Sequence, residues 1–178
     1  PCYMYALTRE GRKPPMVHVR QSLYSLLEPR KKKSTAVNIL GFFAPLQEEC
    51  ELYDLLQGIG VRQIREISRC KDYAEYQCMS EANFNLVLNP EARFAARDFE
   101  ERLQIPSIEL RRLYQIEKIH SQYQALGAAL GAELRDEDMY RETKNTIAGF
   151  REKYPNLTFT LGECMNGDPF ELAVALIQ

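Results

Sequence analysis

Short apolar runs alternate along the chain with longer segments in which apolar residues recur every three or four positions. The recurrence is typical of amphipathic helices, and a short continuous apolar run is typical of a strand buried on both faces. Three of the runs are followed by a proline and a helical pattern: residues 36–40 before Pro45, 84–88 before Pro90, and 157–161 before Pro169. Proline suits the first position of a helix, because its missing N–H has no helical partner there. The pattern predicts repeated strand–turn–helix units, which are typical of a parallel sheet wound with helices.

Two further strands complete the predicted sheet. Residues 63–67 alternate polar and apolar side chains, which predicts an edge strand with one wet face, and residues 105–110 form a fourth strand that begins at an Ile-Pro step. The predicted helices span 46–56, 73–79, 91–103, 116–130, 136–154 and the residues from Pro169 onward. The fold class is therefore α/β, a Rossmann-like or flavodoxin-like three-layer sandwich with a mainly parallel sheet of about five strands.

The order of the strands predicts where a ligand site lies. The apolar first strand is expected at the centre and the polar second strand outermost, which gives a core order of 2-1-3-4. In such sheets ligands bind where the strand order reverses, outside the carboxyl ends of the strands. The loops 41–45 and 89–91 are expected to face each other at that point.

Three segments are predicted along the chain. Residues 1–34 form a connecting segment and residues 35–154 the Rossmann-like domain. Residues 155–178 are either the last strand and helix of the same sheet or the start of a following Rossmann-like domain. The chain begins without an initiator Met and ends inside an apolar helical pattern, so we expect it to be a piece of a longer protein.

Composition limits the partners and the compartment. The 23 Lys and Arg residues against 25 Asp and Glu residues leave a net charge of −2, which gives no reason to expect nucleic acid. No apolar stretch approaches the ~20 residues that a membrane span requires. The five cysteines include no C-x-x-C pair and no secretory signal precedes them, so we expect reduced thiols in a cytoplasmic protein.

Motifs for common chemistry are missing from the sequence. There is no G-x-G-x-x-G, no G-x-x-x-x-G-K-[ST] and no nucleophile elbow, so a dinucleotide or nucleoside triphosphate held in the usual way is not expected. Neither histidine, His18 or His120, lies at the end of a predicted strand. The spacing of the cysteines matches no zinc module. We therefore assign no catalytic residue and no metal ligand from the sequence.

The candidate cofactor-binding residues are chosen by their place at strand ends and turns. They are Phe42, Asn89, Arg111, Asn166 and Gly167. Each also has a structural interpretation: Phe42 covers the core, Asn89 caps a helix, Arg111 lies at the surface, and Asn166-Gly167 forms a turn. The wider set of candidates adds Phe43, Arg69, Cys70, Arg112 and the residues from Cys164 to Met165.

Several short motifs resemble a known family. They are VNILG at 37–41, a helix of the type 46–56, NLVL at 85–88 followed by a helix, and LQIP at 103–106 leading into a strand. Together they resemble the central Rossmann-like domain of nitrogenase component 1-type oxidoreductases. This family includes the large subunits of nitrogenase, the scaffold proteins for its cofactor, and the dark-operative protochlorophyllide and chlorophyllide reductases. Residues 162–172 resemble the opening of the Rossmann-like domain that follows in such proteins.

The resemblance implies a part of an oxidoreductase subunit that helps to enclose a metallocluster or a tetrapyrrole substrate. It implies two partners, a paralogous or identical component 1-type subunit and an ATP-dependent iron–sulfur reductase that delivers electrons. In the nitrogenase subunit that holds the catalytic cofactor, a cysteine ligand follows the third strand of this domain, and here Asn89 stands in that place. An amide is a poor ligand for a soft iron–sulfur centre, which prefers thiolate.

We therefore expect no cofactor in this piece of the protein, with any iron–sulfur or related metallocluster confined to the full-length complex. We also expect the piece to be inactive alone. The alternative that the residues leave open is a self-contained flavodoxin-like module that binds a small ligand without redox chemistry.

Overall fold

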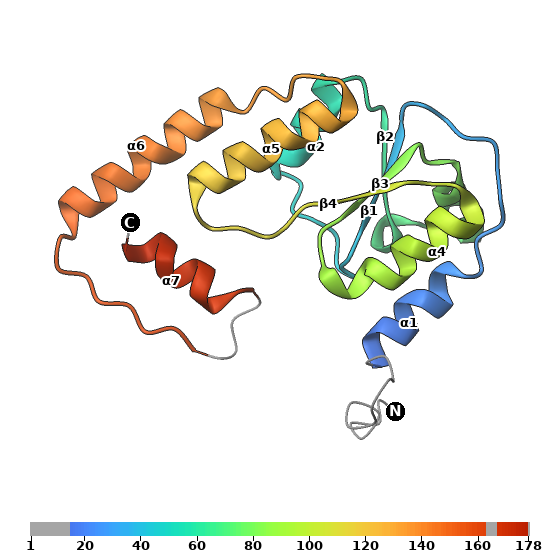
Figure 1. Ribbon diagram of the computed structural model, residues 1–178, viewed down its shortest axis with the longest axis horizontal. Helices are drawn as coiled ribbons and strands as arrows, with labels where there is room; N and C mark the ends of the chain where they lie inside the picture. The colour runs from blue at the N-terminus through green and yellow to red at the C-terminus, as the bar shows by residue number, and fades with distance from the viewer. Residues whose placement is uncertain (1–14, 163–166, 178) are drawn as a thin grey trace. The chain divides into compact units, whose positions relative to one another are not determined.

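The computed structural model describes residues 15–162 and 167–177 and has an α/β fold with a parallel sheet flanked by helices (Figure 1). The four strands are β1 (Ala36–Leu40), β2 (Gln63–Glu66), β3 (Phe84–Val87) and β4 (Ser107–Glu109). They pair in the order β2-β1-β3-β4, and every pair is parallel. The predicted α/β class, the 2-1-3-4 order and the edge position of residues 63–67 are confirmed.

The helices alternate with the strands and then continue beyond them. They are α1 (Pro15–Tyr24), α2 (Glu51–Gly58), α3 (Tyr73–Gln77), α4 (Arg93–Leu103), α5 (Ile116–Leu130), α6 (Glu137–Lys153) and α7 (Pro169–Ile177), with 3-10 turns η2 (Ile67–Arg69), η3 (Cys78–Glu81) and η4 (Pro90–Ala92). Among the described residues, no helix has the length and apolar character needed to cross a bilayer.

The described chain divides into two compact units. Residues 15–53 together with Gly60–Arg111 form the first unit, which contains the whole sheet, and residues 54–59 together with 112–177 form the second. The domain boundaries that the sequence indicated, after residues 34 and 154, stay a prediction.

The predicted fifth strand is wrong. Residues 157–161 pair with none of the four strands, and the described residues form one sheet only. Leu157, Phe159 and Leu161 remain 37–49% exposed. An apolar run becomes a strand only where a neighbouring strand accepts its backbone hydrogen bonds, and the described part of the chain supplies no such neighbour here.

The predicted start of the helix at 46–56 is also wrong, because α2 begins at Glu51 instead of residue 46. Ala44 is a poor N-cap, so Pro45 does not open a helix. The backbone of Leu46 is bound by side chains instead: its N–H donates to Glu66 Oε2 at 2.8 Å, and its carbonyl accepts from Arg69 Nη2 at 2.9 Å. The other predicted helices are present, the one at 73–79 as α3 continued by η3.

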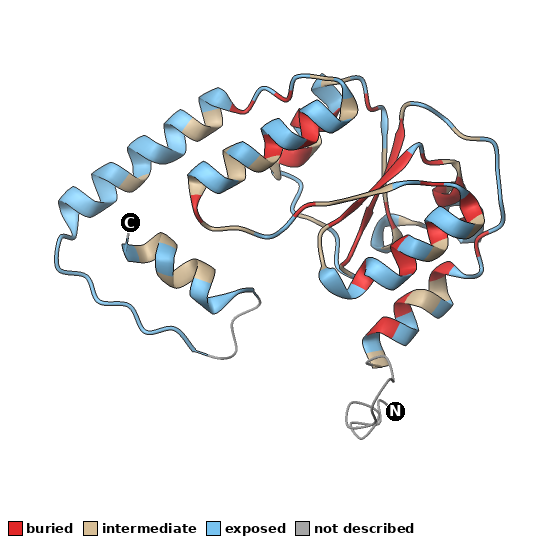
Figure 2. Ribbon diagram, in the orientation of Figure 1, coloured by how far each residue is buried: buried red, intermediate tan, exposed pale blue. Residues whose placement is uncertain are grey.

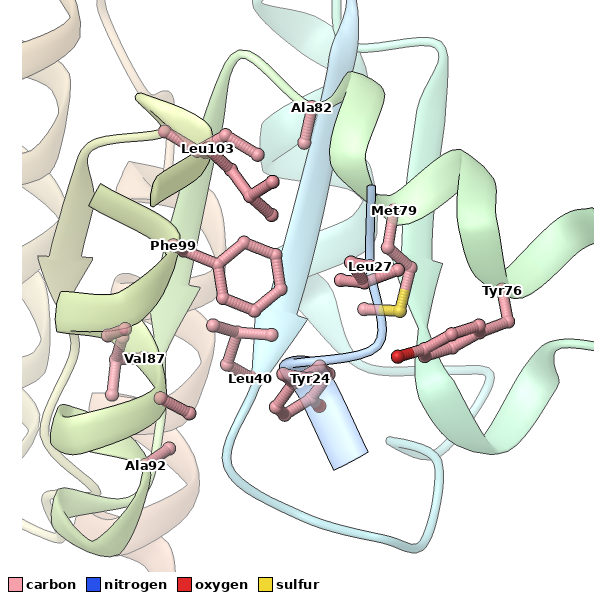
Figure 3. Close-up of a cluster of buried hydrophobic side chains, with 13 residues drawn as sticks. Tyr24, Leu27, Leu40, Tyr76, Met79, Ala82, Val87, Ala92, Phe99 and Leu103 are labelled. Carbon is pink, nitrogen blue, oxygen red and sulfur yellow. The ribbon is translucent and has the colours of Figure 1, made fainter. Parts of the chain in front are cut away.

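Buried residues gather on the central strands and on parts of the helices α1 and α4 (Figure 2). Every residue of β1 and β3 is buried, whereas only Glu66 is buried in the edge strand β2. Phe99 and Leu103 of α4 point toward β1, and the ring of Tyr24 from α1 meets Phe99 edge-on with centroids 5.2 Å apart (Figure 3). This cluster also contains Leu40 and Val87, so α1 and α4 pack against the carboxyl ends of β1 and β3.

A mostly buried carboxylate in η3 ties three segments together. Glu81 accepts from Lys33 at 2.6 Å and from Arg65 at 3.0 Å, and its carboxylate lies 3.7 Å from Arg30. Burial alone would raise the pKa of Glu81, but the hydrogen bond and charge of Lys33, with the charges of Arg65 and Arg30, lower it below its ordinary value. In β4, two hydrogen bonds from Arg93 likewise lower the pKa of Glu109.

These lowered pKa values give a pH dependence of stability. A carboxyl group with a lowered folded-state pKa stabilises the fold above its ordinary pKa of 4.5 and loses that contribution as the pH falls through the lowered value. We therefore expect the free energy of unfolding to decline between about pH 5 and pH 3. Denaturant titrations should show a shallower decline for Glu81→Gln, whereas Glu101→Gln, at an exposed position of α4, should keep the wild-type profile. An unchanged profile in Glu81→Gln would contradict this assignment.

Candidate functional site

The loops that follow β1 and β3 are in direct contact. Gly41, the first residue after β1, has φ +140°, and a Cβ atom placed on it would lie 2.7 Å from the backbone nitrogen of Asn89. No side chain fits between the two loops at that distance. The loops 41–45 and 89–91 thus meet at the carboxyl ends of the central strands, where the strand order reverses.

Asn89 caps the helical segment that follows β3. Its backbone is extended, with φ −131° and ψ 126°, and its Oδ1 accepts a hydrogen bond from the N–H of Glu91 at 2.9 Å. Pro90 follows at the first position of η4, where its missing N–H costs nothing. The side-chain oxygen of Asn89 is therefore used in capping.

Arg20 of α1 brings a buried positive charge to the same place. Its Nε donates to the Gly41 carbonyl at 3.2 Å, its Nη1 pairs with the Glu91 carboxylate, and its guanidinium lies 4.9 Å from the centroid of the Phe43 ring. The Arg20 side chain is 7% exposed, whereas that of Glu91 is 46% exposed. We call Arg20, Gly41, Phe43, Asn89 and Glu91 the switch-point cluster.

Sequence reasoning missed Arg20, although the pattern held a signal. Val17, Arg20 and Tyr24 follow each other at spacings of three and four, and all three are buried on one face of α1. An arginine on the apolar face of an amphipathic helix requires an acceptor or an anion inside the fold. That spacing alone could have drawn attention to residue 20.

The other predicted site residues lie in different places. Phe42 is half-buried in the loop after β1, and Arg111 is an exposed residue just after β4, with its Nε 3.7 Å from Glu109 Oε1. Gly167 belongs to the second unit and contacts the hydroxyl of Tyr114 so closely that a Cβ would clash with it. Asn166 lies outside the described residues, as does the stretch from Glu163. Of the five predicted residues, Phe42 and Asn89 belong to the two loops that meet.

A second group of residues fixes the loop that follows β1. Glu66, at the end of β2, is 5% exposed and accepts from the Leu46 N–H, from the Tyr53 hydroxyl and from Arg69 Nε. Burial and the hydrogen bond to Glu66 raise the pKa of Tyr53 to about 12, with Arg69 opposing the shift. Arg69 and Glu66 therefore hold the backbone at Leu46, between the loop after β1 and the helix α2.

The second unit contains its own histidine–aspartate pair. His120 of α5 lies with Nδ1 2.9 Å from both carboxylate oxygens of Asp136, and its ring stacks on that of Tyr140 at 4.7 Å. Asp136 occupies the N-cap position of α6 but makes no capping hydrogen bond, because its carboxylate faces the imidazole. The pair joins α5 to α6, and no strand end contributes to it.

Comparison with known proteins identifies the family. The family model of nitrogenase component 1 type oxidoreductases matches residues 11–176, which is nearly the whole chain. The chain belongs to this family. No curated protein matches it. The match includes both compact units, so the component 1-type assignment applies to the helical second unit as well as to the sheet.

A component 1-type domain can enclose a metallocluster, so the chemistry of the switch-point cluster decides whether its residues fit one. Iron–sulfur centres are held chiefly by cysteine thiolates. Here α1 presents a guanidinium, and the loop after β3 presents a carboxylate paired with it and an amide engaged in capping. Among the described residues, no three His, Cys, Asp or Glu side chains converge on one point. These residues do not fit a cluster bound through this part of the domain.

The described cysteines of this component 1-type domain support the same conclusion. Cys50, Cys70 and Cys78 are free thiols. Burial raises the pKa of Cys50, and burial and the charge of Glu75 raise the pKa of Cys70. Cys70 also packs against the core and donates to the Glu66 carbonyl at 3.4 Å.

Proposed function

We propose that this chain is part of a component 1-type oxidoreductase subunit that encloses its reaction site together with a paralogous or identical subunit. The enclosed group is a metallocluster or a tetrapyrrole substrate, and electrons reach it from an ATP-dependent iron–sulfur reductase. Membership of the family over residues 11–176 carries this proposal. It favours an oxidoreductase subunit over a self-contained ligand-binding module of similar fold.

In this proposal the switch-point cluster lines the reaction site without ligating metal. Arg20 is bonded to Gly41 and Glu91 and lies over Phe43, so its charge has a fixed position. A fixed guanidinium and a side-chain amide orient polar or anionic groups of a bound molecule. Phe43, 37% exposed, offers an apolar face beside them. Any metal ligands are supplied by other parts of the enzyme.

The Asn89 variants test whether this loop faces the bound group. Asn89→Ala should lower the free energy of unfolding by about 1 kcal/mol, because the cap is lost. Asn89→Ser and Asn89→Asp should keep the melting temperature, since both side chains accept the hydrogen bond from the Glu91 N–H. Asn89→Asp should nevertheless lose activity in the intact enzyme, because it replaces the NH₂ donor by a negative charge.

Thermal melts and turnover of the intact enzyme are measured together, with the reductase and ATP each omitted in turn. We expect turnover only when both are present. Full activity in Asn89→Asp would remove Asn89 from the proposed site. Turnover without the reductase or without ATP would contradict the proposed route of the electrons.

A further inference from the structure

A row of polar side chains crosses the sheet at one register. Arg65 of β2 is the Cα partner of Asn38 in β1, Asn38 is the partner of Asn85 in β3, and Asn85 is the partner of Ser107 in β4. Partners on neighbouring strands project to the same face of the sheet. Asn38 and Asn85 are fully buried, so their polar atoms are cut off from bulk solvent.

The hydrogen bonds of the row fix the orientation of the Asn38 amide. Its Nδ2 donates to the carbonyl of Met79 at 2.8 Å and to Asn85 Oδ1 at 2.8 Å, and Asn85 Nδ2 in turn donates to Ser107 Oγ at 3.2 Å. Because Met79 and Asn85 present acceptors, the group that faces them must be the NH₂. Asn38 Oδ1 is left as a buried acceptor without a protein partner.

The neighbouring strand carries the complementary atom. Arg65 Nη2 donates to Gln63 Oε1 at 2.5 Å and to Glu81 Oε2 at 3.0 Å, whereas Arg65 Nη1 is buried without a protein partner. Asn38 is bonded to Met79 and Arg65 to Glu81, and both of these belong to the short turn η3. A buried donor and a buried acceptor therefore lie on adjacent strands against the same turn.

We propose that one ordered water molecule is bound between Arg65 Nη1 and Asn38 Oδ1. The water accepts a hydrogen bond from the guanidinium and donates one to the amide oxygen. The guanidinium disfavours a metal cation at this point, and the amide oxygen disfavours an anion, so a neutral molecule with both a donor and an acceptor fits best. Buried waters typically occupy such polar sites and pair groups that the protein leaves unpaired.

The bound water completes a hydrogen-bonded row from β2 to β4 and holds the register of the edge strand. A shift of β2 by one residue would turn Arg65 away from Asn38 and move Glu66 from its buried position. Glu66 binds the Leu46 N–H in the loop after β1. The water thus supports the register that keeps Glu66 bonded to Leu46.

A crystal structure of the full chain at about 1.5 Å resolution tests this site. We expect a density peak within about 2.7–3.2 Å of both Asn38 Oδ1 and Arg65 Nη1. A direct hydrogen bond between these two side chains, or the lack of a peak, would overturn the proposal.

A solution measurement tests the same site independently. In ¹⁵N-labelled protein, we expect a cross-peak between long-lived water and the Asn38 side-chain amide protons. The cross-peak should be lost in Arg65→Met and kept in Arg97→Met, a matched change at an exposed position of α4. Wild-type intensity in Arg65→Met would exclude Arg65 from the site and overturn the proposal. If Arg65→Met does not fold, the wild-type crystal and spectrum decide.

Discussion

Gly41→Ala is expected to lower the free energy of unfolding by about 3 kcal/mol, the sum of backbone strain and a steric clash. The residue has φ +140°, a conformation that favours glycine, and the new Cβ would lie 2.7 Å from the nitrogen and 2.9 Å from the Cβ of Asn89. Relief of this clash requires the loops after β1 and β3 to separate, which also disturbs the cap at Asn89. Denaturant unfolding monitored by circular dichroism measures the change.

Gly60→Ala separates the two contributions. Gly60 has φ +92°, but no atom lies within 4 Å of the position that its Cβ would take. This variant carries the strain without the clash, so its loss should be about 1 kcal/mol. An equal loss of unfolding free energy in the two variants would contradict the contact between Gly41 and Asn89.

Arg20→Met should lower the free energy of unfolding by about 2 kcal/mol, the second-largest effect. The change keeps the length of the side chain but leaves the Gly41 carbonyl and the Glu91 carboxylate without the guanidinium. Because Glu91 is 46% exposed, water compensates part of its loss, and the cost stays below that of a fully buried pair. The stability of Arg20→Lys should lie between those of the wild type and Arg20→Met, since an ammonium group cannot reproduce the fixed fork of donors.

Arg97→Met serves as the control for Arg20→Met. Arg97 is exposed on α4, so the same chemical change there should alter the stability by less than about 0.5 kcal/mol. Denaturant unfolding of both variants gives the comparison. If Arg20→Met and Arg97→Met were equally stable, the contacts of Arg20 with Gly41 and Glu91 would not hold α1 to the sheet.

The sheet could be predicted from the sequence because burial leaves a clear pattern in strands. Residues 36–40 and 84–88 are nearly continuous apolar runs, and they form the two central strands. The alternation in residues 63–67 indicated one wet face and hence an edge. The wrong prediction of a strand at residues 157–161 has the same origin. An apolar run indicates that burial is favourable, but it does not identify the element that buries it.

The site was harder to predict because its contacts join residues far apart in the chain. The cap at Asn89 is local and could be predicted from an asparagine before a proline. The pair of Arg20 and Glu91 spans 71 positions, and the bond from Leu46 to Glu66 spans 20, so neither leaves a pattern within a single helix or strand. The latter bond also explains why α2 begins later than predicted.

Iron content measured across a set of single variants tests most directly whether the switch point lines the site without binding metal. The intact protein is purified under anaerobic conditions, and iron is quantified in the wild type, Asn89→Ala, Cys50→Ser, Cys70→Ser and Cys78→Ser. We expect the same iron content in all five proteins. Asn89 serves as a helix cap, and among the described residues no three His, Cys, Asp or Glu side chains converge on one point. Loss of a cluster in any one of the variants, with the fold intact by circular dichroism, would contradict this assignment.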